Sequence, residues 1–199
     1  MWVKICGVRS IEAALHAQAC GASAIGLNLH PGSSRYISPR DAARISEAVD
    51  IECILVVVDR SEAEVAELVR SIRPTGVQLH GNEPPGFGDS LDVDVFKAFA
   101  ARPGAREQIL VHQKDRFLLD AWVPGRLGGT GVRADPALAR ELAGLGDMIL
   151  AGGLTPENVH GLIERIQPFG VDVASGVESA PGVQDLNRIS AFISAARSG

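Results

Sequence analysis

Two side chains in this sequence have the chemistry needed to move a proton between carbon and oxygen. Cys6 stands near the end of the apolar run 2–7, and Asp120 stands near the end of the run 116–121. If both face one site, a thiolate base lies opposite a carboxylic acid. For that work the site must lower the pKa of Cys6 and raise that of Asp120. The alternative is a small buried thiol and an ordinary polar strand end.

Two glycine-containing turns have the composition of a phosphate-binding site. Gly152-Gly153 and Ser175-Gly176 each follow a short apolar run. Because glycine has no Cβ, backbone N–H groups in such turns can approach an oxyanion closely. Ser175 could also open a short helix whose N-terminus faces the phosphate. A plain tight turn needs the same glycines, so the phosphate interpretation depends on the two turns being neighbours in space.

Further charged side chains are candidates for binding a substrate or for a structural ion pair inside the barrel. Arg35 follows a Gly-Ser-Ser stretch in a loop, where a guanidinium can grip a carboxylate with two parallel hydrogen bonds. His80 ends the run 76–81 and is neutral or charged near pH 7. Lys4 shares strand parity with Cys6, and Asp172 is the partner we expect for it if it is buried. The sequence has no HxH, HExxH or paired acidic cluster, and we predict no metal site.

The elements that must position these residues form an alternating series. Eight apolar, largely β-branched runs occur along the chain, at 2–7, 24–29, 52–59, 76–81, 94–100, 116–121, 148–153 and 170–176. Between them lie amphipathic segments that begin after Ser10, Ser38-Pro39, Ser61, Asp135-Pro136, Thr155-Pro156 and Asp185, which are typical helix starts. The segments 83–91 and 102–111 are weaker helix candidates. Runs that are apolar throughout are typical of parallel strands covered on both faces.

This alternation predicts the α/β class and a single (β/α)8 barrel, the TIM-barrel architecture, over residues 1–199. Eight units in 199 residues leave about 25 residues for each, so the barrel must be compact with short loops. The active site of such a barrel lies at the carboxyl ends of the strands, where Cys6, His80, Asp120 and the two glycine turns stand. An open doubly wound sheet is the alternative, but the Gly-rich fingerprint after its first strand is missing.

Composition excludes several classes of partner. The chain carries 19 Lys and Arg against 24 Asp and Glu, a formal net charge of -5, so we expect neither nucleic acid nor a membrane surface as a partner. No apolar segment is long enough to cross a membrane or serve as a signal peptide. Its three cysteines form no CxxC pair, which favours a reducing, cytoplasmic location. We expect a monomer or a homodimer.

Several motifs together resemble one enzyme family. VKICG stands at the start, SSRYISP after the second run, VQLHGNE at the fourth, LLDA at the sixth, ILAGGLTPENV at the seventh and VDVASGVESAPGVQD at the eighth. In this order and spacing they are similar to phosphoribosylanthranilate isomerases of tryptophan biosynthesis. The combination of VKICG with ASGVE and PGVQD is the specific part of the pattern.

The resemblance implies an Amadori rearrangement of N-(5-phosphoribosyl)anthranilate to 1-(2-carboxyphenylamino)-1-deoxyribulose 5-phosphate. It assigns Asp120 as the general acid, Cys6 as the general base and Arg35 as the residue that holds the anthranilate carboxylate. It places the phosphate on Gly152, Gly153, Ser175 and Gly176, and His80 completes our set of substrate-binding candidates. No cofactor is implied, because an iminium ion formed on the substrate is the electron sink.

The sequence also departs from the family pattern. After Gly128-Gly129-Thr130-Gly131 it reads Val132-Arg133-Ala134 where the family commonly has a Lys and an aromatic residue, and Arg133 is our candidate for the missing positive charge. Asn28 and His30 stand where apolar or aromatic residues are commoner, which predicts a more polar mouth and altered substrate tolerance. The alternatives are another phosphosugar isomerase or epimerase barrel, and a catalytically silent barrel that binds an anionic metabolite or a protein.

Overall fold

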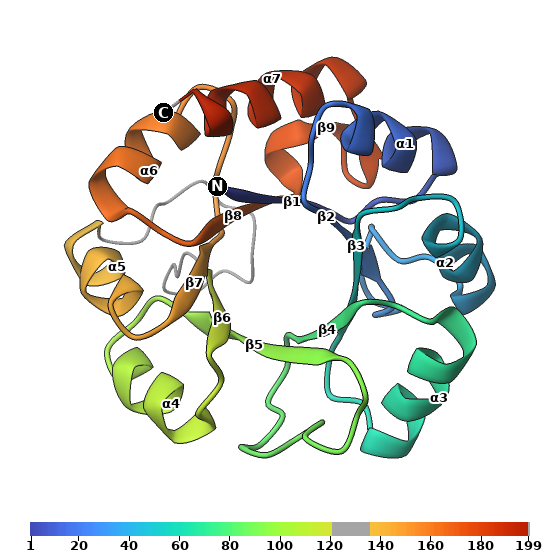
Figure 1. The fold of residues 1–199 in the computed structure, drawn as a ribbon, viewed down its shortest axis with the longest axis horizontal. Helices are drawn as coiled ribbons and strands as arrows, with labels where there is room; N and C mark the ends of the chain where they lie inside the picture. Colours follow the sequence, from blue (N-terminus) through green and yellow to red (C-terminus); the bar gives the residue numbers. More distant parts are fainter. Residues whose placement is uncertain (121–135, 199) are drawn as a thin grey trace.

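The computed structural model describes residues 1–120 and 136–198, and its eight parallel strands close into a barrel in sequence order (Figure 1). The first and last strands pair directly, with Lys4 opposite Asp172, so the open-sheet alternative is wrong. The strands are β1 (Trp2–Cys6), β2 (Ala24–Asn28), β3 (Glu52–Val57), β4 (Gly76–Leu79), β5 (Asp94–Ala100), β6 (Arg116–Asp120), β7 (Asp147–Leu150) and β8 (Gly170–Val173). All eight expected strands are confirmed.

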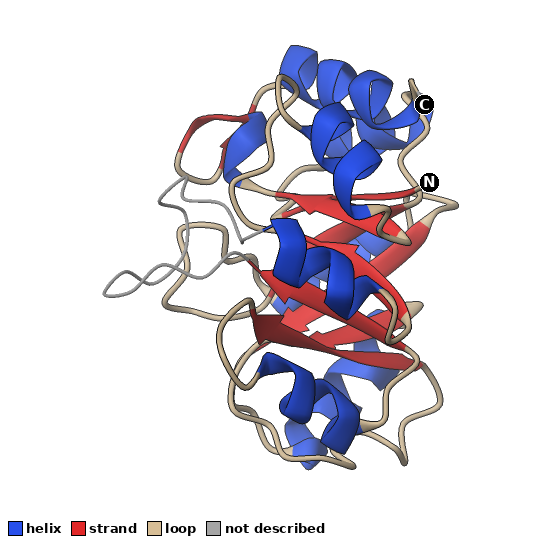
Figure 2. Cartoon of the chain, turned by 90° about the vertical axis from the view of Figure 1, so that its left-hand side faces the viewer, coloured by secondary structure: helices blue, strands red, loops and turns tan. Residues whose placement is uncertain are grey.

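Helices surround the barrel on its outer face (Figures 1 and 2). They are α1 (Ile11–Ala19), α2 (Pro39–Ser46), α3 (Glu62–Ile72), α4 (Ala105–His112), α5 (Pro136–Ala143), α6 (Val159–Ile166) and α7 (Leu186–Arg197). The expected start signals cap four of them, since Ser10, Ser38, Ser61 and Asp185 each accept a hydrogen bond from a backbone N–H in the first turn. At α3 the cap is reciprocal, because Glu64 bonds back to Ser61.

Three local expectations needed correction. The sixth helix begins at Val159, because the side chain of Asn158 accepts from the N–H of Thr155 and donates to the carbonyl of Gly153, which makes 155–158 a turn. The segment 83–91 forms turns and contains no helix, as its two prolines and two glycines require. The helix expected over 102–111 begins only at Ala105, after Gly104 at a φ of 86°.

An additional layer follows β8 at the mouth of the barrel. Ser175–Val177 forms a single turn of 3-10 helix, which confirms the short helix expected after Ser175. A small hairpin of β9 (Glu178–Ala180) and β10 (Val183–Gln184) comes next, and the sequence reasoning missed it. Gln184 anchors the hairpin by donating to the carbonyl of Gly7, at the end of β1, over 2.7 Å.

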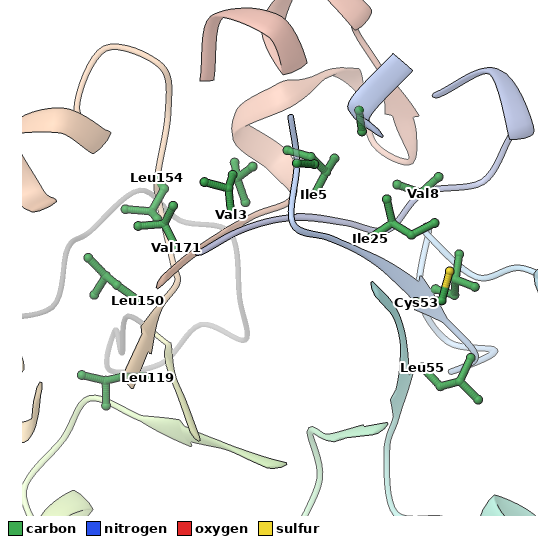
Figure 3. Packing of buried hydrophobic residues seen from close by; sticks show 14 of the residues in the cluster. Val3, Ile5, Val8, Ile25, Cys53, Leu55, Leu119, Leu150, Leu154 and Val171 are labelled. Atoms are coloured by element: carbon green, nitrogen blue, oxygen red, sulfur yellow. The ribbon is translucent and has the colours of Figure 1, made fainter. Parts of the chain in front are cut away.

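Strand parity divides the core into two regions. Alternate strand residues such as Val3, Ile5, Ile25, Leu55 and Leu119 point outward and pack beneath the helices (Figure 3). The intervening residues fill the lumen, where a small apolar cluster contains Trp2, Ala24, Ile54, Phe96, Leu118, Ile149 and Ala151. Above that cluster the lumen is polar, with Lys4, Gln78 and Asp172 all buried. Within the described ranges no helix is long and apolar enough to cross a membrane.

Candidate active site

A cavity of about 870 Å³ lies at the carboxyl ends of the strands. Among the residues that line it are Cys6, Arg35, His80, Asp120, Gly152, Gly153 and Ser175. The cavity therefore brings together every candidate site residue except Gly176, which packs behind its wall against the backbone of Leu154. Its size suits a ligand of a few hundred daltons.

Cys6 lies on the floor of the cavity and is about 9% exposed. Burial raises the pKa of its thiol to about 11, although the neighbouring Lys4 ammonium favours the thiolate. The expectation that the site lowers this pKa is therefore wrong. Gly26 makes room for the thiol on the next strand, where a Cβ would lie 2.8 Å from both Cys6 Sγ and Lys4 Cε.

Lys4 and Asp172 form the expected ion pair inside the barrel. Lys4 Nζ lies 3.0 Å from Asp172 Oδ1, and the Lys4 side chain is fully buried. Asp172 and Cys6 both raise the pKa of Lys4, against the cost of its burial. Lys4 therefore carries a fixed positive charge directly below the cavity.

Arg35 enters the cavity from the loop after β2, and its own partner is a carboxylate of the chain. Arg35 Nε and Nη2 donate to the two carboxylate oxygens of Glu178 over 2.6 and 2.8 Å. This bidentate contact raises the pKa of Arg35. The expected two-bond grip on a carboxylate is present, but that carboxylate is Glu178 of the chain itself.

His80 and Asp120 face each other across the cavity. His80 Nε2 lies 3.8 Å from Asp120 Oδ2, and both side chains are about one-third exposed to the open cavity, at 38% and 32%. On its other side His80 Nδ1 lies 2.8 Å from Nε2 of the buried Gln78. Enclosure by the cavity wall and the nearby Lys4 lower the pKa of His80, so the ring is neutral at pH 7.

The loop that follows His80 is held by a buried ion pair. Lys97 Nζ lies 3.0 Å from Glu83 Oε2 and donates to the carbonyl of Gly81 over 2.6 Å. Glu83 also accepts from the backbone N–H groups of Gly81 and Asp59. Asp59, after β3, accepts from the backbone N–H of Asn82 in this loop and does not line the cavity.

The two glycine turns lie on the same side of the mouth, as the phosphate interpretation requires. Gly152 and Gly153 have φ angles of 84° and 69°, in the left-handed region that favours glycine. Ser175 is exposed and lines the cavity beside them. These turns could present backbone donors to one anion, next to the short helix that Ser175 opens.

The two polar substitutions near the second strand also lie at the mouth. Asn28 and His30 both line the cavity and place polar side chains at its mouth. Asn28 accepts from the backbone N–H of His30 over 2.9 Å and so shapes the loop that carries Arg35. The departures at 128–134, including Arg133, lie outside the described residues.

Sequence reasoning gave no role to two residues of this site, Gln78 and Glu178. Gln78 lies two residues before His80, so strand parity could have placed it in the lumen. Glu178 ends the ASGVE motif, but nothing in that motif indicates its partner Arg35, which is 143 positions away. In the described ranges no group of three or more His, Cys, Asp or Glu is arranged to hold a metal ion.

Comparison with known proteins gives one consistent result. Residues 3–195 match the family model of N-(5'phosphoribosyl)anthranilate (PRA) isomerase. The N-(5'-phosphoribosyl)anthranilate isomerase of Geobacter sulfurreducens is 40% identical over 198 residues, which cover 98% of each chain. The phosphoribosyl anthranilate isomerase of Thermotoga maritima superposes with a TM-score of 0.93 at 34% identity over the full length of both chains.

One similar structure contains a ligand. A phosphoribosyl anthranilate isomerase in complex with reduced 1-(o-carboxyphenylamino)-1-deoxyribulose 5-phosphate has a TM-score of 0.89 and 33% identity, again over all of both chains. That ligand carries a carboxylate at one end and a phosphate at the other.

Proposed function

This chain belongs to the N-(5'-phosphoribosyl)anthranilate isomerase family, enzymes of tryptophan biosynthesis, and on that premise we propose how its own residues carry out the reaction. The substrate is N-(5-phosphoribosyl)anthranilate, and the product is 1-(2-carboxyphenylamino)-1-deoxyribulose 5-phosphate. The observation that carries the proposal is the single cavity lined by both Cys6 and Asp120. The proposed reaction is an internal redox rearrangement, in which C1 is reduced and C2 is oxidised without any external electron carrier.

In the first step Asp120 acts as the general acid. Its carboxyl proton passes to the ring oxygen of the ribose as the C1–O bond breaks, and the electron pair of that bond stays on the oxygen. The nitrogen lone pair forms the C1=N bond of an iminium ion. Asp120 ends this step as a carboxylate, facing the His80 ring.

In the second step Cys6 acts as the general base at C2. The thiolate takes the C2 proton, and the electron pair of the C–H bond forms a C1=C2 double bond while the iminium nitrogen becomes neutral. The resulting enolamine becomes the aminoketose when C1 gains a proton and the hydroxyl on C2 loses one. Atoms and charge balance without a cofactor.

The raised pKa of the Cys6 thiol fits this order of events. With a pKa of about 11, Cys6 is almost entirely a thiol at neutral pH. An iminium ion beside the sulfur adds a positive charge to that of Lys4, and both favour the thiolate. As the intermediate forms, the thiol releases its proton to solvent, and the resulting thiolate takes the C2 proton. A thiolate of high proton affinity is also a strong base.

Binding of the two ends of the substrate would set its orientation. We assign Arg35 to the anthranilate carboxylate, and Gly152, Gly153 and Ser175 to the phosphate, with Gly176 allowing their two turns to approach each other. His80 lines the same cavity. A chain of net charge -5 can bind this anion because the backbone turns and one placed arginine supply the contacts.

The remaining proposals concern the molecule as a whole. We propose that residues 1–199 form one domain, because the strands from both ends of the chain pair in one barrel. A cytoplasmic location is supported by Cys6, Cys20 and Cys53, all of which are free thiols. We propose that the chain is a monomer or a homodimer, since the relatives include a dimeric isomerase from Thermotoga maritima and monomers generated from it.

The decisive test is a fluorescence assay on freshly prepared phosphoribosylanthranilate with the wild type, Cys6→Ser and Asp120→Asn. We expect activity in the wild type and a loss of at least about 10²-fold in kcat for each variant, which is typical of a removed general acid or base. Cys20→Ser and the exposed Asp50→Asn are matched controls that should keep wild-type activity. Undiminished activity in either site variant would contradict the role assigned to that residue.

A further inference from the structure

A row of polar contacts crosses the lumen from Asp172 to Asp120. Asp172 pairs with Lys4 at 3.0 Å, and Lys4 Nζ donates to Gln78 Oε1 over 2.6 Å. Gln78 Nε2 then lies 2.8 Å from His80 Nδ1, and His80 Nε2 lies 3.8 Å from Asp120 Oδ2. The row therefore links the charge beneath Cys6 to the carboxyl group of Asp120.

The chemistry of Lys4 fixes the direction of each contact in the row. An ammonium group can only donate, so the Gln78 atom facing it must be the carbonyl oxygen. The other end of the amide is then the NH2 group, which donates to His80 Nδ1. A neutral imidazole that accepts at Nδ1 carries its proton on Nε2, and that is the nitrogen facing Asp120.

We propose that Gln78 is a positioning residue for the isomerase reaction, holding His80 by its Nδ1 so that the Nε2–H is presented to Asp120. The proposal rests on the role of Asp120 proposed above. After Asp120 has given up its proton, this N–H group faces the new carboxylate and stabilises it as the ring of the sugar opens. A ring with its proton on Nδ1 would present a lone pair to that carboxylate and repel it.

The charges around His80 keep the ring in the neutral form that this role needs. Lys4 on β1 and Lys97 on β5 disfavour an imidazolium, while Asp172 on β8 and Glu83 after β4 favour it, together with Asp120 on β6. Enclosure of the ring is the largest effect, and the net result lowers the pKa of His80. An imidazolium here would hold Asp120 ionised and remove the proton that the first step needs.

The experiment reverses the hydrogen bond between residue 78 and His80 Nδ1 without changing the shape of the side chain at position 78. In Gln78→Glu the introduced carboxylate still accepts from Lys4 but must also accept from His80, which moves the ring proton to Nδ1 or creates an imidazolium. Gln78→Met removes the contact without burying a new charge. Gln108→Glu, on the exposed face of α4, adds the same charge far from the site as a control.

Two readouts are needed, and the first does not depend on activity. Long-range proton–nitrogen NMR distinguishes the two tautomers of a histidine ring, and the His80 signals are those missing from His80→Gln. At pH 7 we expect the Nε2–H tautomer of His80 in the wild type and in Gln108→Glu. In Gln78→Glu we expect the Nδ1–H tautomer or an imidazolium, and in Gln78→Met a mixture of the two neutral tautomers. In the isomerase assay we expect kcat to fall at least about tenfold in both Gln78 variants with KM nearly unchanged.

The outcomes separate this inference from the proposed function. A wild-type ring with its proton on Nδ1, or a switched ring in Gln78→Glu with unchanged kcat, would overturn the positioning role. An inactive wild type that shows the Nε2–H form would contradict the proposed function and leave the tautomer assignment standing. A rise in KM alone, with kcat preserved, would also count against the proposal, because a positioning residue for Asp120 acts on the chemical step.

Discussion

Arg35 and Glu178 form a two-bond ion pair at the edge of the active-site cavity. Glu178 bonds to Nε and Nη2, which form one edge of the guanidinium group. The adjacent edge, made by Nη1 and the outer N–H of Nη2, is geometrically able to form a second bidentate contact. Glu178 is therefore suited to hold Arg35 in place while its other edge meets the carboxylate of the substrate.

This arrangement leads to a test of substrate binding. Glu178→Gln loses the charge that holds Arg35, and we expect KM to rise about tenfold with a smaller change in kcat, because a hydrogen bond to a charged group contributes about 1.5 to 3 kcal/mol. Steady-state kinetics would measure both constants. The exposed Glu47→Gln is the matched control and should leave KM unchanged. A KM equal to that of the wild type would contradict the positioning of Arg35 by Glu178.

Sequence reasoning located the strand ends and therefore the site, because strand parity and the closure of a barrel leave little freedom there. Lys4 and Asp172 show this well, since their pairing followed from parity and neighbouring strands alone. Cys6 shows the limit. The pKa of its thiol depends on the balance between burial, which raises it, and the Lys4 charge, which lowers it. That balance depends on how completely the lumen is filled, and no local sequence pattern indicates this. The partner of Arg35 was equally inaccessible, because it depends on where a distant loop folds back.

Gly26 gives a test of the space around the Cys6 thiol. A Cβ at this position would lie 2.8 Å from both Cys6 Sγ and Lys4 Cε, so Gly26→Ala must displace one of them. We expect a loss of about 1 to 3 kcal/mol in the free energy of unfolding, typical of overpacking, and a marked fall in kcat. Gly161→Ala in α6 is the control, since its Cβ meets open space and should stabilise the helix slightly. Equal kinetics in the two variants would argue against the tight contact.

The raised pKa of Cys6 has a consequence for stability at alkaline pH. Below pH 9 the thiol is protonated in both the folded and the unfolded chain. Between pH 9 and 11 the unfolded chain releases this proton and the folded chain keeps it, so the free energy of unfolding falls as pH rises. At pH 10.5 the loss from this one group should be about 2 kcal/mol.

Urea denaturation at pH 8 and pH 10.5 would measure this effect. We expect the wild type to lose about 2 kcal/mol more than Cys6→Ala between the two pH values. Cys20→Ala, which keeps the buried thiol of Cys6, should behave like the wild type. If the wild type and Cys6→Ala lose stability in parallel, the thiol has an ordinary pKa in the folded protein.

Arg116 allows the stability of the barrel to be separated from its catalysis. It begins β6, the strand that ends in Asp120, and therefore lies at the opposite end of the lumen. Its guanidinium carbon is 5.4 Å from the ring centres of both Trp2 and Phe169. Its Nη1 lies 3.2 Å from Glu52 and 3.1 Å from Asp94. These contacts tie β6 to β1, β3, β5 and the loop before β8.

We expect Arg116→Met to lower the free energy of unfolding by about 1 to 3 kcal/mol, through lost cation–π and ion-pair contacts that are only partly exposed. Its kcat and KM should stay at wild-type values at temperatures where the variant remains folded. The reason is that the active site of such a barrel lies at the carboxyl ends of the strands, away from Arg116. Arg102→Met, an exposed arginine outside any such stack, should leave both stability and kinetics unchanged. A fall in kcat for folded Arg116→Met would show that the two ends of β6 are coupled, contrary to this separation.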